Sequence, residues 1–567
     1  MRELFMRFRP FFVYAGLFSL VINTLLLAPT FYMLEVFDRV FTSRSDETLT
    51  MLSIGAAMAL ATMAFLDILR GRLLAGAGVA LDRALGPRVL SGVLAQTARL
   101  SGAEYLNGLR DVATLRSFLV GSGIFAIFDA PWLPLFMVII FFFHPLLGVA
   151  ACCGSLLMFL LAFFNERVTR RPLERVQGDA KRASRFIDAA VRNAEVVSAL
   201  GMLPAVTRRW AALNDEVLKQ QVVASGTGGA FSALTKFSRQ FIQMGMMATG
   251  AYLVIDQHVT PGVMMATTII LGRALAPVEM LVAGWKHLVE ARSALQRLDQ
   301  LLAANPPAAP GTELPAPQGE LAVERVVFGL RGQERPIIRG VSFALEAGEQ
   351  LGVIGPSASG KSTLVRLVVG VWKPASGNVR LDGADVAVWP RDRLGPYIGY
   401  LPQDVELFAG TVAENIARLG EVDSEAVIRA AQRAHVHELI LRLPKGYDTD
   451  IGESGNSLSP GQRQRIGLAR ALYGEPRLVV LDEPNANLDA EGEEALARAM
   501  RELRQAGATV IVVAHRPSLL ASVDKLLVLR EGVAEMFGPR AEVMARVTRG
   551  GPAPATTAAL RRDAGAA

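Results

Sequence analysis

The chain has 567 residues, 51% of them hydrophobic, and its mean hydropathy of +0.32 is high for a soluble protein. The only two cysteines are the neighbours Cys152 and Cys153, which face apart on a helix and so argue against a structural disulfide or a cysteine metal site. The apolar excess lies in the first half of the chain, which excludes a single soluble domain.

Six apolar runs in this half approach the length that a bilayer requires, about twenty residues each. They occupy 11–28, 51–69, 123–143, 145–164, 241–255 and 263–282. The fifth run is short, and the sixth contains Arg273 and Glu279. The first run lacks the small-residue cleavage site of a signal peptide and is followed by Pro29, so we interpret it as a retained span.

Positive charge alternates along the segments between these runs. Arginines precede the first run and fill the long segment after the second, and arginines with a few lysines fill the long segment after the fourth, whereas 35–47 is mixed and 256–261 has none. Because cations are retained on the cytoplasmic side, both termini are predicted to lie in the cytoplasm. Membrane topology therefore explains the sequence pI of 9.4 better than nucleic-acid binding does.

The third run contains one carboxylate, Asp129, followed by Pro131 and Trp132. An ionisable group inside a span is a functional candidate that faces a cavity or a partner. We favour the alternative, in which Asp129 lies near the cytoplasmic end of the span and caps the helix that begins at Pro131.

Composition changes at a Pro- and Ala-rich segment, 303–318, which we interpret as a semi-rigid linker. It separates a predicted helical transmembrane domain, 1–302, from a domain at 319–545 in which short apolar strands alternate with amphipathic helices. This alternation predicts an α/β fold. The tail, 546–567, is predicted to be disordered, because from Gly550 it is rich in Ala, Pro and Thr and has no aromatic residue.

A glycine-rich loop follows the strand predicted at 350–354 and opens a helix, and it consists of Gly355, Pro356, Ser357, Ala358, Ser359, Gly360, Lys361, Ser362 and Thr363. In a phosphate-binding loop, backbone N–H groups surround the phosphates, the lysine reaches the β and γ oxygens, and the serine after it binds Mg²⁺. We therefore predict binding of ATP or GTP; a plain glycine-rich turn is the weaker alternative.

An entirely apolar strand at 478–482 ends in Asp482, and Glu483 follows. Such a strand is typical of a buried parallel sheet, which binds ligands at the carboxyl ends of its strands. We predict that Asp482 holds Mg²⁺ through water and that Glu483 polarises the attacking water. Taken alone, the pair would more often be a helix N-terminal cap.

The pentapeptide Leu458-Ser459-Pro460-Gly461-Gln462 stands twenty residues ahead of this strand. With Ser459 as N-cap and Pro460 as first helical residue, the free N–H groups of the helix start point outward and suit a γ-phosphate from a second subunit. The segment resembles the LSGGQ signature of ABC ATPases. The family usually has Gly at position 460, and proline removes one backbone donor. The alternative is a plain N-capped surface helix.

Three more residues match the ABC ATPase family in the expected order. Gln403 resembles the Q-loop residue that senses Mg²⁺, Asp489 resembles the D-loop residue, and His515 resembles the switch histidine at the γ-phosphate. Each alone has a structural alternative: an amide in a turn, an N-cap, a histidine at a strand end. The resemblance implies the following sets: catalytic Glu483 and His515; nucleotide contacts from the glycine-rich loop, Gln403, Ser459, Gly461, Gln462 and Asp489; metal contacts from Ser362, Gln403 and Asp482.

One position departs from the family. An aromatic residue usually stacks on adenine upstream of the glycine-rich loop, but Leu330 stands there. Phe328 lies two residues earlier on the same strand face, so it could take this role or belong to the core.

Six spans ahead of one ATPase domain resemble an ABC exporter half-transporter, which works as a homodimer, and 450–453 resembles the X-loop of exporters. Coupling helices are expected near 107–118 and 202–210. Within exporters, the resemblance is closest to the protease-exporting branch of bacterial type I secretion ATPases, and it is carried by 32–40, 128–132, 355–357 and 481–489.

This resemblance implies an inner-membrane protein with a cytoplasmic ATPase domain. Its cargo would be an unfolded polypeptide with an uncleaved C-terminal signal, exported through a periplasmic membrane-fusion adaptor and a TolC-type outer-membrane channel. About ten residues precede the first run, so no N-terminal peptidase domain is expected. A lipid or drug flippase would share every ATPase motif and is the main alternative. A soluble ABC ATPase is disfavoured by the apolar runs, and an ATP-gated channel by the presence of both Glu483 and His515.

Overall fold

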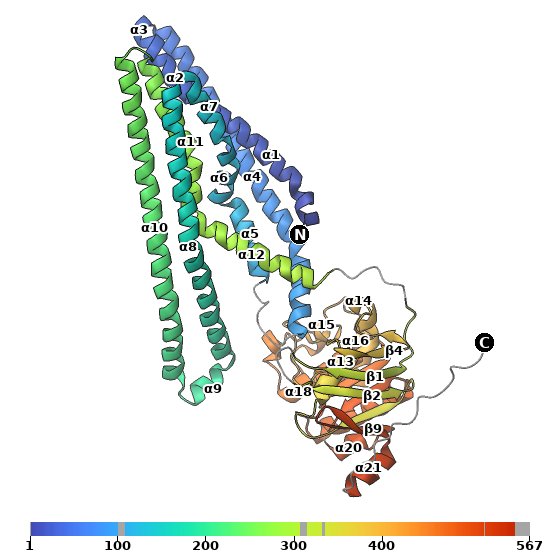
Figure 1. Cartoon of the computed structure of the whole chain (residues 1–567). Coiled ribbons are helices and arrows are strands. Elements are labelled where there is room, and N and C mark those ends of the chain that lie inside the picture. Colours follow the sequence, from blue (N-terminus) through green and yellow to red (C-terminus); the bar gives the residue numbers. More distant parts are fainter. Residues whose placement is uncertain (1, 100–107, 307–313, 331–334, 515, 550–567) are drawn as a thin grey trace, which may run out of the picture. The chain divides into compact units, whose positions relative to one another are not determined.

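The computed structural model describes residues 2–99, 108–306, 314–330, 335–514 and 516–549. It divides into two compact units, Met1–Pro306 and Pro307–Ala567. In the described residues the first unit is built from helices, and the second combines strands with short helices (Figure 1).

Three very long helices dominate the first unit: α4 (Asp46–Arg99), α8 (Pro145–Arg192) and α10 (Leu203–Ile255). With 54 residues, α4 extends about 80 Å at a rise of about 1.5 Å per residue, against a bilayer core of about 30 Å. These helices therefore reach far beyond a membrane.

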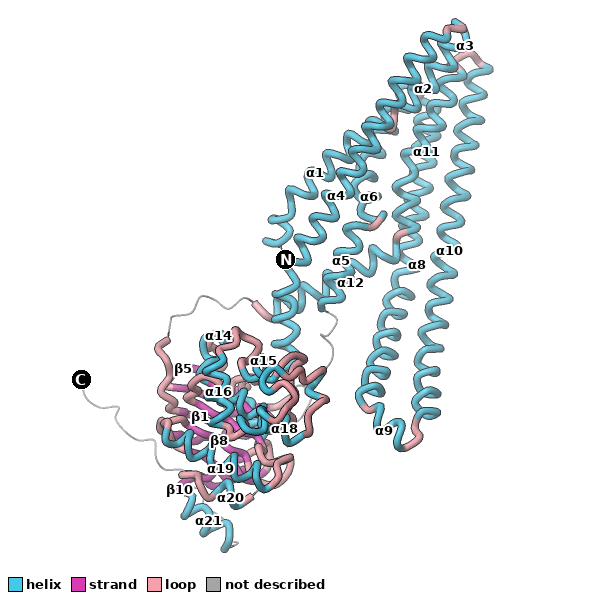
Figure 2. Tube along the Cα trace, turned by 180° about the vertical axis from the view of Figure 1, so that it is seen from behind, coloured by secondary structure: helices cyan, strands magenta, loops and turns pink. Residues whose placement is uncertain are grey.

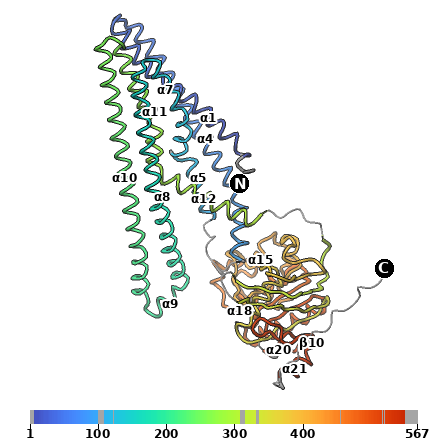
Figure 3. Tube along the Cα trace, in the orientation of Figure 1, coloured from blue at the N-terminus to red at the C-terminus, as the bar shows by residue number. Residues whose placement is uncertain are grey.

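The remaining helices of this unit are shorter. They are α1 (Arg2–Leu25), α2 (Ala28–Glu35), the π-helix η1 (Val36–Val40), α3 (Phe41–Ser43), α5 (Gly108–Val120), α6 (Ser122–Asp129), the 3₁₀ turn η3 (Ala130–Trp132), α7 (Leu133–Phe143), α9 (Ala194–Ala199), α11 (Pro261–Ala283) and α12 (Trp285–Ala304). Figure 3 shows α8 and α10 side by side and joined by α9. The short connecting helix is therefore α9, whereas the expected coupling segment 202–210 mostly begins α10.

The six predicted apolar runs lie almost entirely in helices, and only the first is broken, by a turn at 26–27 between α1 and α2. Among the described residues, five stretches are long and apolar enough to cross a membrane: Phe8–Ser43, Asp46–Ala98, Gly123–Phe143, Pro145–Arg192 and Pro261–Ala283. The fifth predicted run, 241–255, forms the last part of α10 and is not among them. Met244, Tyr252 and Ile255 are exposed there, as lipid-facing residues would be. The span predicted at 241–255 therefore remains a prediction.

The third span is interrupted where Asp129 stands, and the capping prediction for this residue is wrong. The carboxylate makes no capping hydrogen bond. Its Oδ1 instead accepts from Arg70 on α4 at 2.7 Å and from Asn23 on α1 at 3.0 Å. The Arg70 side chain is only 5% exposed, so it requires a counter-charge more than the helix start requires a cap.

The π-helix η1 lies within the 32–40 stretch that carried part of the family resemblance. Asp38 Oδ1 accepts from the backbone N–H of Gly262 at 2.9 Å, and its other oxygen accepts from the Thr260 hydroxyl. Asp38 thus caps α11 from a distant part of the chain. A Cβ added at Gly262 would stand 2.6 Å from this carboxylate, which explains the glycine.

The second unit contains two sheets (Figure 2). The smaller sheet has the order β2-β1-β4-β5, and the larger has the order β10-β9-β3-β8-β7-β6. The strands are β1 (Leu321–Phe328), β2 (Ile338–Leu345), β3 (Gln350–Ile354), β4 (Ser376–Leu381), β5 (Ala384–Asp385), β6 (Ile398–Leu401), β7 (Leu478–Asp482), β8 (Thr509–Val513), β9 (Lys525–Arg530) and β10 (Val533–Pro539).

Short helices surround the sheets. They are α13 (Lys361–Val368), α14 (Arg391–Leu394), α15 (Val412–Ile416), α16 (Ser424–Arg433), α17 (His437–Leu441), α18 (Pro460–Leu472), α19 (Ala490–Gln505), α20 (Pro517–Leu520) and α21 (Arg540–Arg549). Alternate residues of β7 belong to two separate hydrophobic cores: Val479 and Leu481 to one, Leu478 and Val480 to the other. The strand is therefore buried on both faces, as its unbroken apolar sequence predicted.

Two predicted boundaries are displaced. Helix α12 continues to Ala304, two residues into the predicted linker, and α21 continues to Arg549, four residues into the predicted tail. Helix α21 buries Val543 against the domain core and continues past it through the exposed residues 545–547. Residues 307–313 of the linker and 550–567 of the tail lie outside the described residues.

Candidate active site

The larger sheet brings the candidate residues to one edge. Its strands β3, β8, β7 and β6 are neighbours and all run parallel, so their carboxyl ends lie together. The glycine-rich loop follows β3, Gln403 follows β6, and Asp482 ends β7. His515 follows β8 in the sequence but lies outside the described residues.

The glycine-rich loop requires its glycines because atoms of neighbouring strands lie so close. A Cβ at Gly355 would stand 2.1 Å from the carbonyl oxygen of Leu529. Gly360 has φ 100° and a Cβ there would stand 2.8 Å from Ile338. Gly360 is the N-cap of α13 and provides no side-chain cap, which leaves the first N–H groups of the helix available to a phosphate.

Lys361 lies across this loop. Its Nζ donates to the carbonyl oxygens of Gly355 at 2.9 Å and Pro356 at 3.0 Å, and the residue is only 6% exposed. Burial lowers the pKa of Lys361, and the charges of Glu483 and Asp482 oppose that shift. The ammonium is thus held where phosphates on the loop would pair with it.

Asp482 and Ser362 form the metal-binding part of the site. Asp482 is 2% exposed, and its Oδ1 has no hydrogen-bond partner among the described residues. Burial raises the pKa of Asp482, while the Ser362 side chain, which hydrogen-bonds to the carboxylate, and the charges of Arg366 and Lys361 lower it. A buried carboxylate oxygen without a partner, beside a hydroxyl, is a donor set that fits Mg²⁺.

Glu483 occupies a strained position next to this pair. It has φ 47°, a conformation that costs a non-glycine residue about 1–3 kcal/mol and is concentrated at functional sites. Its backbone N–H donates to Val513 O at 3.1 Å. Its carboxylate accepts from Gln403 Nε2 at 3.1 Å, so the structure brings these two predicted residues into contact.

The segment that resembles the signature forms the predicted N-terminal cap. Ser459 Oγ accepts from the backbone N–H of Gln462 at 3.2 Å, and Gln462 Oε1 accepts from that of Ser459 at 2.9 Å. A Cβ at Gly461 would stand 2.8 Å from Asn487 O, so the helix start packs closely on the segment after β7. The helix and its capping serine are confirmed.

Asp489 has the structural role that was its alternative interpretation. Its Oδ1 accepts from the backbone N–H of Gly492 at 2.8 Å and caps α19, and it also pairs with Arg465 at 2.7 Å. These hydrogen bonds, the one from Gly492 first, lower the pKa of Asp489. Arg465 was missed from the sequence; the signal was a charged residue among the mostly apolar buried residues of α18.

Phe328 belongs to the core. Its ring stacks on Trp372, with ring centres 4.9 Å apart and planes 17° apart, and the residue is 9% exposed. Arg366 covers the Trp372 ring at 4.9 Å. Leu330 packs partly buried against the same core. The core interpretation of Phe328 is therefore the one that the packing supports.

Comparison with known proteins gives matches in both units. Residues 12–275 match the family model of the ABC transporter transmembrane region, and residues 338–486 match that of the ABC transporter. The type I secretion system ATP-binding protein PrsD of Rhizobium meliloti (strain 1021) is 46% identical over 543 residues, which are 95% of this chain and 93% of that protein.

More distant relatives cover the chain almost as fully. The cyclolysin secretion/processing ATP-binding protein CyaB of Bordetella pertussis is 32% identical over 93% of this chain and 75% of its own length. The toxin RTX-I translocation ATP-binding protein of Actinobacillus pleuropneumoniae is 28% identical over 95% and 77%. A solved bacterial Atm1-family ABC exporter with ATP bound superimposes with a TM-score of 0.80, at 25% identity, over 95% of this chain and 96% of that one.

Proposed function

This chain belongs to the ABC transporter family, as an exporter of the type I secretion kind that joins a transmembrane region to an ATPase domain, and from this we propose that it drives an unfolded polypeptide out of the cytoplasm. The observation that carries the proposal is the match to a type I secretion ATP-binding protein along nearly the whole chain, membrane half included. ATPase motifs alone would not separate this function from lipid or drug export.

The protein hydrolyses ATP and couples hydrolysis to transport. We infer a site in which the glycine-rich loop and Lys361 bind the phosphates. Ser362, Asp482 and Gln403 would hold Mg²⁺, which neutralises charge on the β and γ oxygens. Glu483 polarises the attacking water, since it stands beside Asp482 and is oriented by Gln403. His515 is assigned to the γ-phosphate from the resemblance alone.

A second copy of the chain completes each site in this proposal. The start of α18 presents Ser459, Gly461 and Gln462 to the γ-phosphate bound by the glycine-rich loop of the partner. Support comes from the capping box, which holds this helix start rigid. Asp489 passes information between copies only indirectly in this scheme, because its carboxylate is held within its own subunit by Gly492 and Arg465.

The protein is a multi-pass membrane protein that belongs to a secretion system. We propose the bacterial inner membrane as its location, with the ATPase domain in the cytoplasm. The partners would be a periplasmic membrane-fusion adaptor and a TolC-type outer-membrane channel. The cargo would carry its signal at its C-terminus and leave the cell without cleavage.

The test is a secretion assay with a reporter that stays unfolded in the cytoplasm, fused to the C-terminal segment of a candidate cargo, in this case a protein encoded beside the transporter. Secretion should require the fusion, the adaptor, the channel and ATP turnover together. If the purified protein instead moves labelled lipid across liposomes without an adaptor, while the reporter stays inside cells, the flippase alternative holds.

A further inference from the structure

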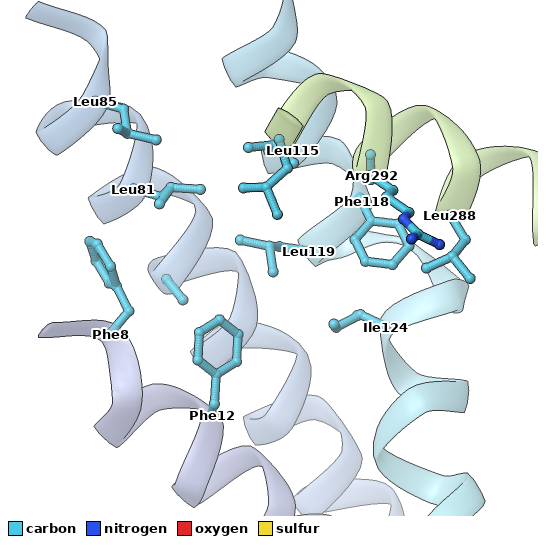
Figure 4. Close-up of a pocket in the computed structure, with 13 residues that line it drawn as sticks. Phe8, Phe12, Leu81, Leu85, Leu115, Phe118, Leu119, Ile124, Leu288 and Arg292 are labelled. Carbon is cyan, nitrogen blue, oxygen red and sulfur yellow. The ribbon is translucent and has the colours of Figure 1, made fainter. Parts of the chain in front are cut away.

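The apolar cavity of the first unit does not specify a ligand. It measures about 340 Å³ and lies between α1, α4, α5, α6 and α12, and Figure 4 shows Phe8, Phe12 and Leu81 on its wall. Among the described residues, Arg292 is the only charged one that lines it. Such a wall suits hydrocarbon of many kinds. Arg418 of the second unit, in contrast, has four defined hydrogen-bond partners.

Residues 402–477 connect β6 to β7, and they carry both Gln403 and the start of α18 at Ser459. The two strands are parallel neighbours, so the chain leaves the sheet at the carboxyl end of β6 and returns at the amino end of β7. In the proposed function Gln403 serves the nucleotide bound by its own chain, and Ser459 serves the nucleotide bound by the partner. The relative position of these two residues within one chain therefore matters to both sites.

Arg418 lies two residues after α15, and its side chain binds backbone carbonyls from two places in the fold. Its Nε donates to Arg470 O at 3.1 Å, and its Nη2 donates to Ala471 O at 3.1 Å and Tyr473 O at 3.2 Å. These carbonyls belong to the last turn of α18 and its C-cap, where a helix leaves acceptors without intrahelical partners. Its Nη1 donates at 2.8 Å to the carbonyl oxygen of Gly395, three residues before β6. One guanidinium thus joins the end of α18 to the start of β6.

The end of α18 packs closely on β6. A Cβ added at Gly399 of β6 would stand 2.5 Å from Ala471 O. Among the described residues no carboxylate pairs with Arg418, and its pKa is lowered by burial and by the charge of Arg470. Carbonyl oxygens, three of them at the negative end of a helix, are therefore what holds this cation.

The backbone at Arg418 is strained. Arg418 has φ 57° and Leu419 has φ 60°, so two consecutive non-glycine residues are left-handed. Such conformations persist only where the surrounding structure holds them, and they are concentrated at functional sites. The four hydrogen bonds of the Arg418 side chain provide this constraint.

The same short helix, α15, also holds the segment that follows Gln403. Asn415 on α15 is fully buried, and its Nδ2 donates to Phe408 O at 2.9 Å and to Thr411 O at 3.0 Å. Its Oδ1 accepts from the backbone N–H of Phe408 at 2.8 Å. Helix α15 is therefore tied through Asn415 to the chain that leaves Gln403, and through Arg418 to the end of α18.

We propose that Arg418 is a positioning residue that holds α18 and β6 together as one body, so that Ser459 and Gln403 keep a fixed separation. Helix α18 has 13 residues and is about 20 Å long, so its start stands about 20 Å from the Arg418 contacts. A tilt of about 3° at these contacts moves the helix start by about 1 Å, a displacement that can lower a rate about 100-fold. This inference rests on the proposed function, in which α18 serves the nucleotide of the partner.

The test replaces Arg418 by lysine in the full-length protein. Arg418→Lys keeps the positive charge at the end of α18 and loses the planar fork of donors. Turnover at saturating ATP should fall about tenfold, because the helix start reaches the nucleotide of the partner less often. The KM for ATP should stay within about twofold, because the glycine-rich loop is unchanged.

Two further variants make the assignment specific. Arg433→Lys is the matched control: among the described residues Arg433 makes one hydrogen bond, to Gly474 O at 3.3 Å, just beyond the same helix. It should turn over ATP like the wild type. Gly399→Ala leaves Arg418 in place but pushes the end of α18 away from β6, so it should reproduce the loss of turnover.

A disulfide measures the position of the helix start directly. With the two native cysteines replaced by Ala, a chain carrying Ser357→Cys, Pro460→Cys and Glu483→Gln should crosslink between copies when ATP and a mild thiol oxidant are added. Adding Arg418→Lys should reduce the crosslinked fraction about fivefold, the effect of one lost hydrogen bond, at a temperature well below the unfolding midpoint. A residue that only stabilises the fold would lower the midpoint and leave the crosslinked fraction of the folded protein unchanged.

The outcomes separate this inference from the proposed function. Turnover and crosslinking of Arg418→Lys equal to those of its parent would overturn the positioning role and leave polypeptide export standing. A lower unfolding midpoint with unchanged turnover would also overturn it, in favour of a helix cap that serves stability alone. Absence of an ATP-dependent crosslink from the parent double-cysteine chain would overturn the shared site of the proposed function and this inference together.

Discussion

At the scale of single residues, the site depends on two carboxylates in different environments. Asp482 is buried beside the Ser362 hydroxyl, and Glu483 stands in a left-handed conformation with its carboxylate on Gln403. The first environment suits a cation and the second suits a water molecule. Asp482 and Glu483 are consecutive residues, and their side chains reach different environments because the chain turns at the end of β7.

Glu483→Gln should bind ATP and hydrolyse it slowly, because the amide keeps the shape of the side chain and loses its ability to polarise water. We expect turnover to fall by a factor of about 10²–10⁴, the usual contribution of a general base. Steady-state ATPase assays beside ATP-binding titrations would measure this. Turnover near that of the wild type would place the base at another residue.

Phe328→Ala should lower the stability of the ATPase domain and leave the relative turnover of ATP and GTP unchanged. Removing a buried ring that stacks on Trp372 should cost about 3–5 kcal/mol of unfolding free energy. Turnover of ATP and GTP should be similar in the wild type, because Leu330 reads a base through shape alone. A strong preference for ATP that disappears in Phe328→Ala would show that Phe328 stacks on adenine after all.

At the scale of elements, the starts of helices α18 and α11 are capped by different kinds of residue. Only one of the two caps can be recognised from the local sequence. The start of α18 is capped by its own residues Ser459 and Gln462, three positions apart. The start of α11 is capped in addition by Asp38, from a π-helix more than two hundred positions away. The first arrangement can be predicted from a short pattern, and the second requires the fold.

Pro460→Gly should make α18 less stable. The variant should bind ATP at least as tightly as the wild type. Glycine loses the preset φ of proline and adds conformational entropy to the unfolded chain, which costs about 0.4–1 kcal/mol. It also restores one N–H at the helix start, so the KM for ATP should fall, by at most about fivefold. Thermal unfolding and ATPase kinetics would measure the two effects. A rise in KM would contradict a role for this helix start in phosphate binding.

Removing one partner of the Arg70–Asp129 pair should destabilise the first unit strongly. Arg70→Met leaves the Asp129 carboxylate without its cation, at an expected cost of about 3–5 kcal/mol, and adding Asp129→Leu should recover much of that. Thermal unfolding in detergent would measure it. Arg170→Ala, which breaks an exposed pair with Glu174, is the control and should change stability by about 1 kcal/mol or less. Equal effects of Arg70→Met and the control would mean that the pair is not needed for the fold.

At the scale of the whole molecule, the chain joins a unit of long helices to an ATPase unit, and its site is proposed to need two chains. Ser357 in the glycine-rich loop and Pro460 at the start of α18 are both exposed on the surface. In the proposed dimer these two positions, from different copies, lie on either side of the same nucleotide.

Cysteines at these two positions should therefore crosslink between copies. With Cys152 and Cys153 replaced by Ala, a chain carrying Ser357→Cys, Pro460→Cys and Glu483→Gln should form a disulfide-linked dimer when ATP is added together with a mild thiol oxidant. Non-reducing electrophoresis would detect it. Chains with only one of the two cysteines are the controls and should remain single. Absence of an ATP-dependent dimer from the double variant would contradict the shared site.

The sequence by itself determined the features that depend on local order. The glycine-rich loop, the acidic end of β7 and the cap of α18 each occupy a few consecutive residues, and their chemistry is set by spacing along one strand or helix. The two-part organisation and the membrane helices followed from composition, because apolar runs of bilayer length need no tertiary information. The boundaries near 302 and 545 were less accurate, because the residue at which a helix ends does not follow from composition, and α12 and α21 each continue past the predicted boundary.

Only the tertiary structure decided which distant side chains meet. Asp129 was expected to cap its own helix, but α1 and α4 bring Asn23 and Arg70 to it, and a buried guanidinium outcompetes a helix start for a carboxylate. Phe328 was open to two roles until Trp372 was placed against it. Asn165 on α8 and Trp285 at the start of α12 are more than a hundred residues apart, and no pattern along the chain shows that they line the same cavity. Contacts of this kind depend on packing in three dimensions, which local spacing does not encode.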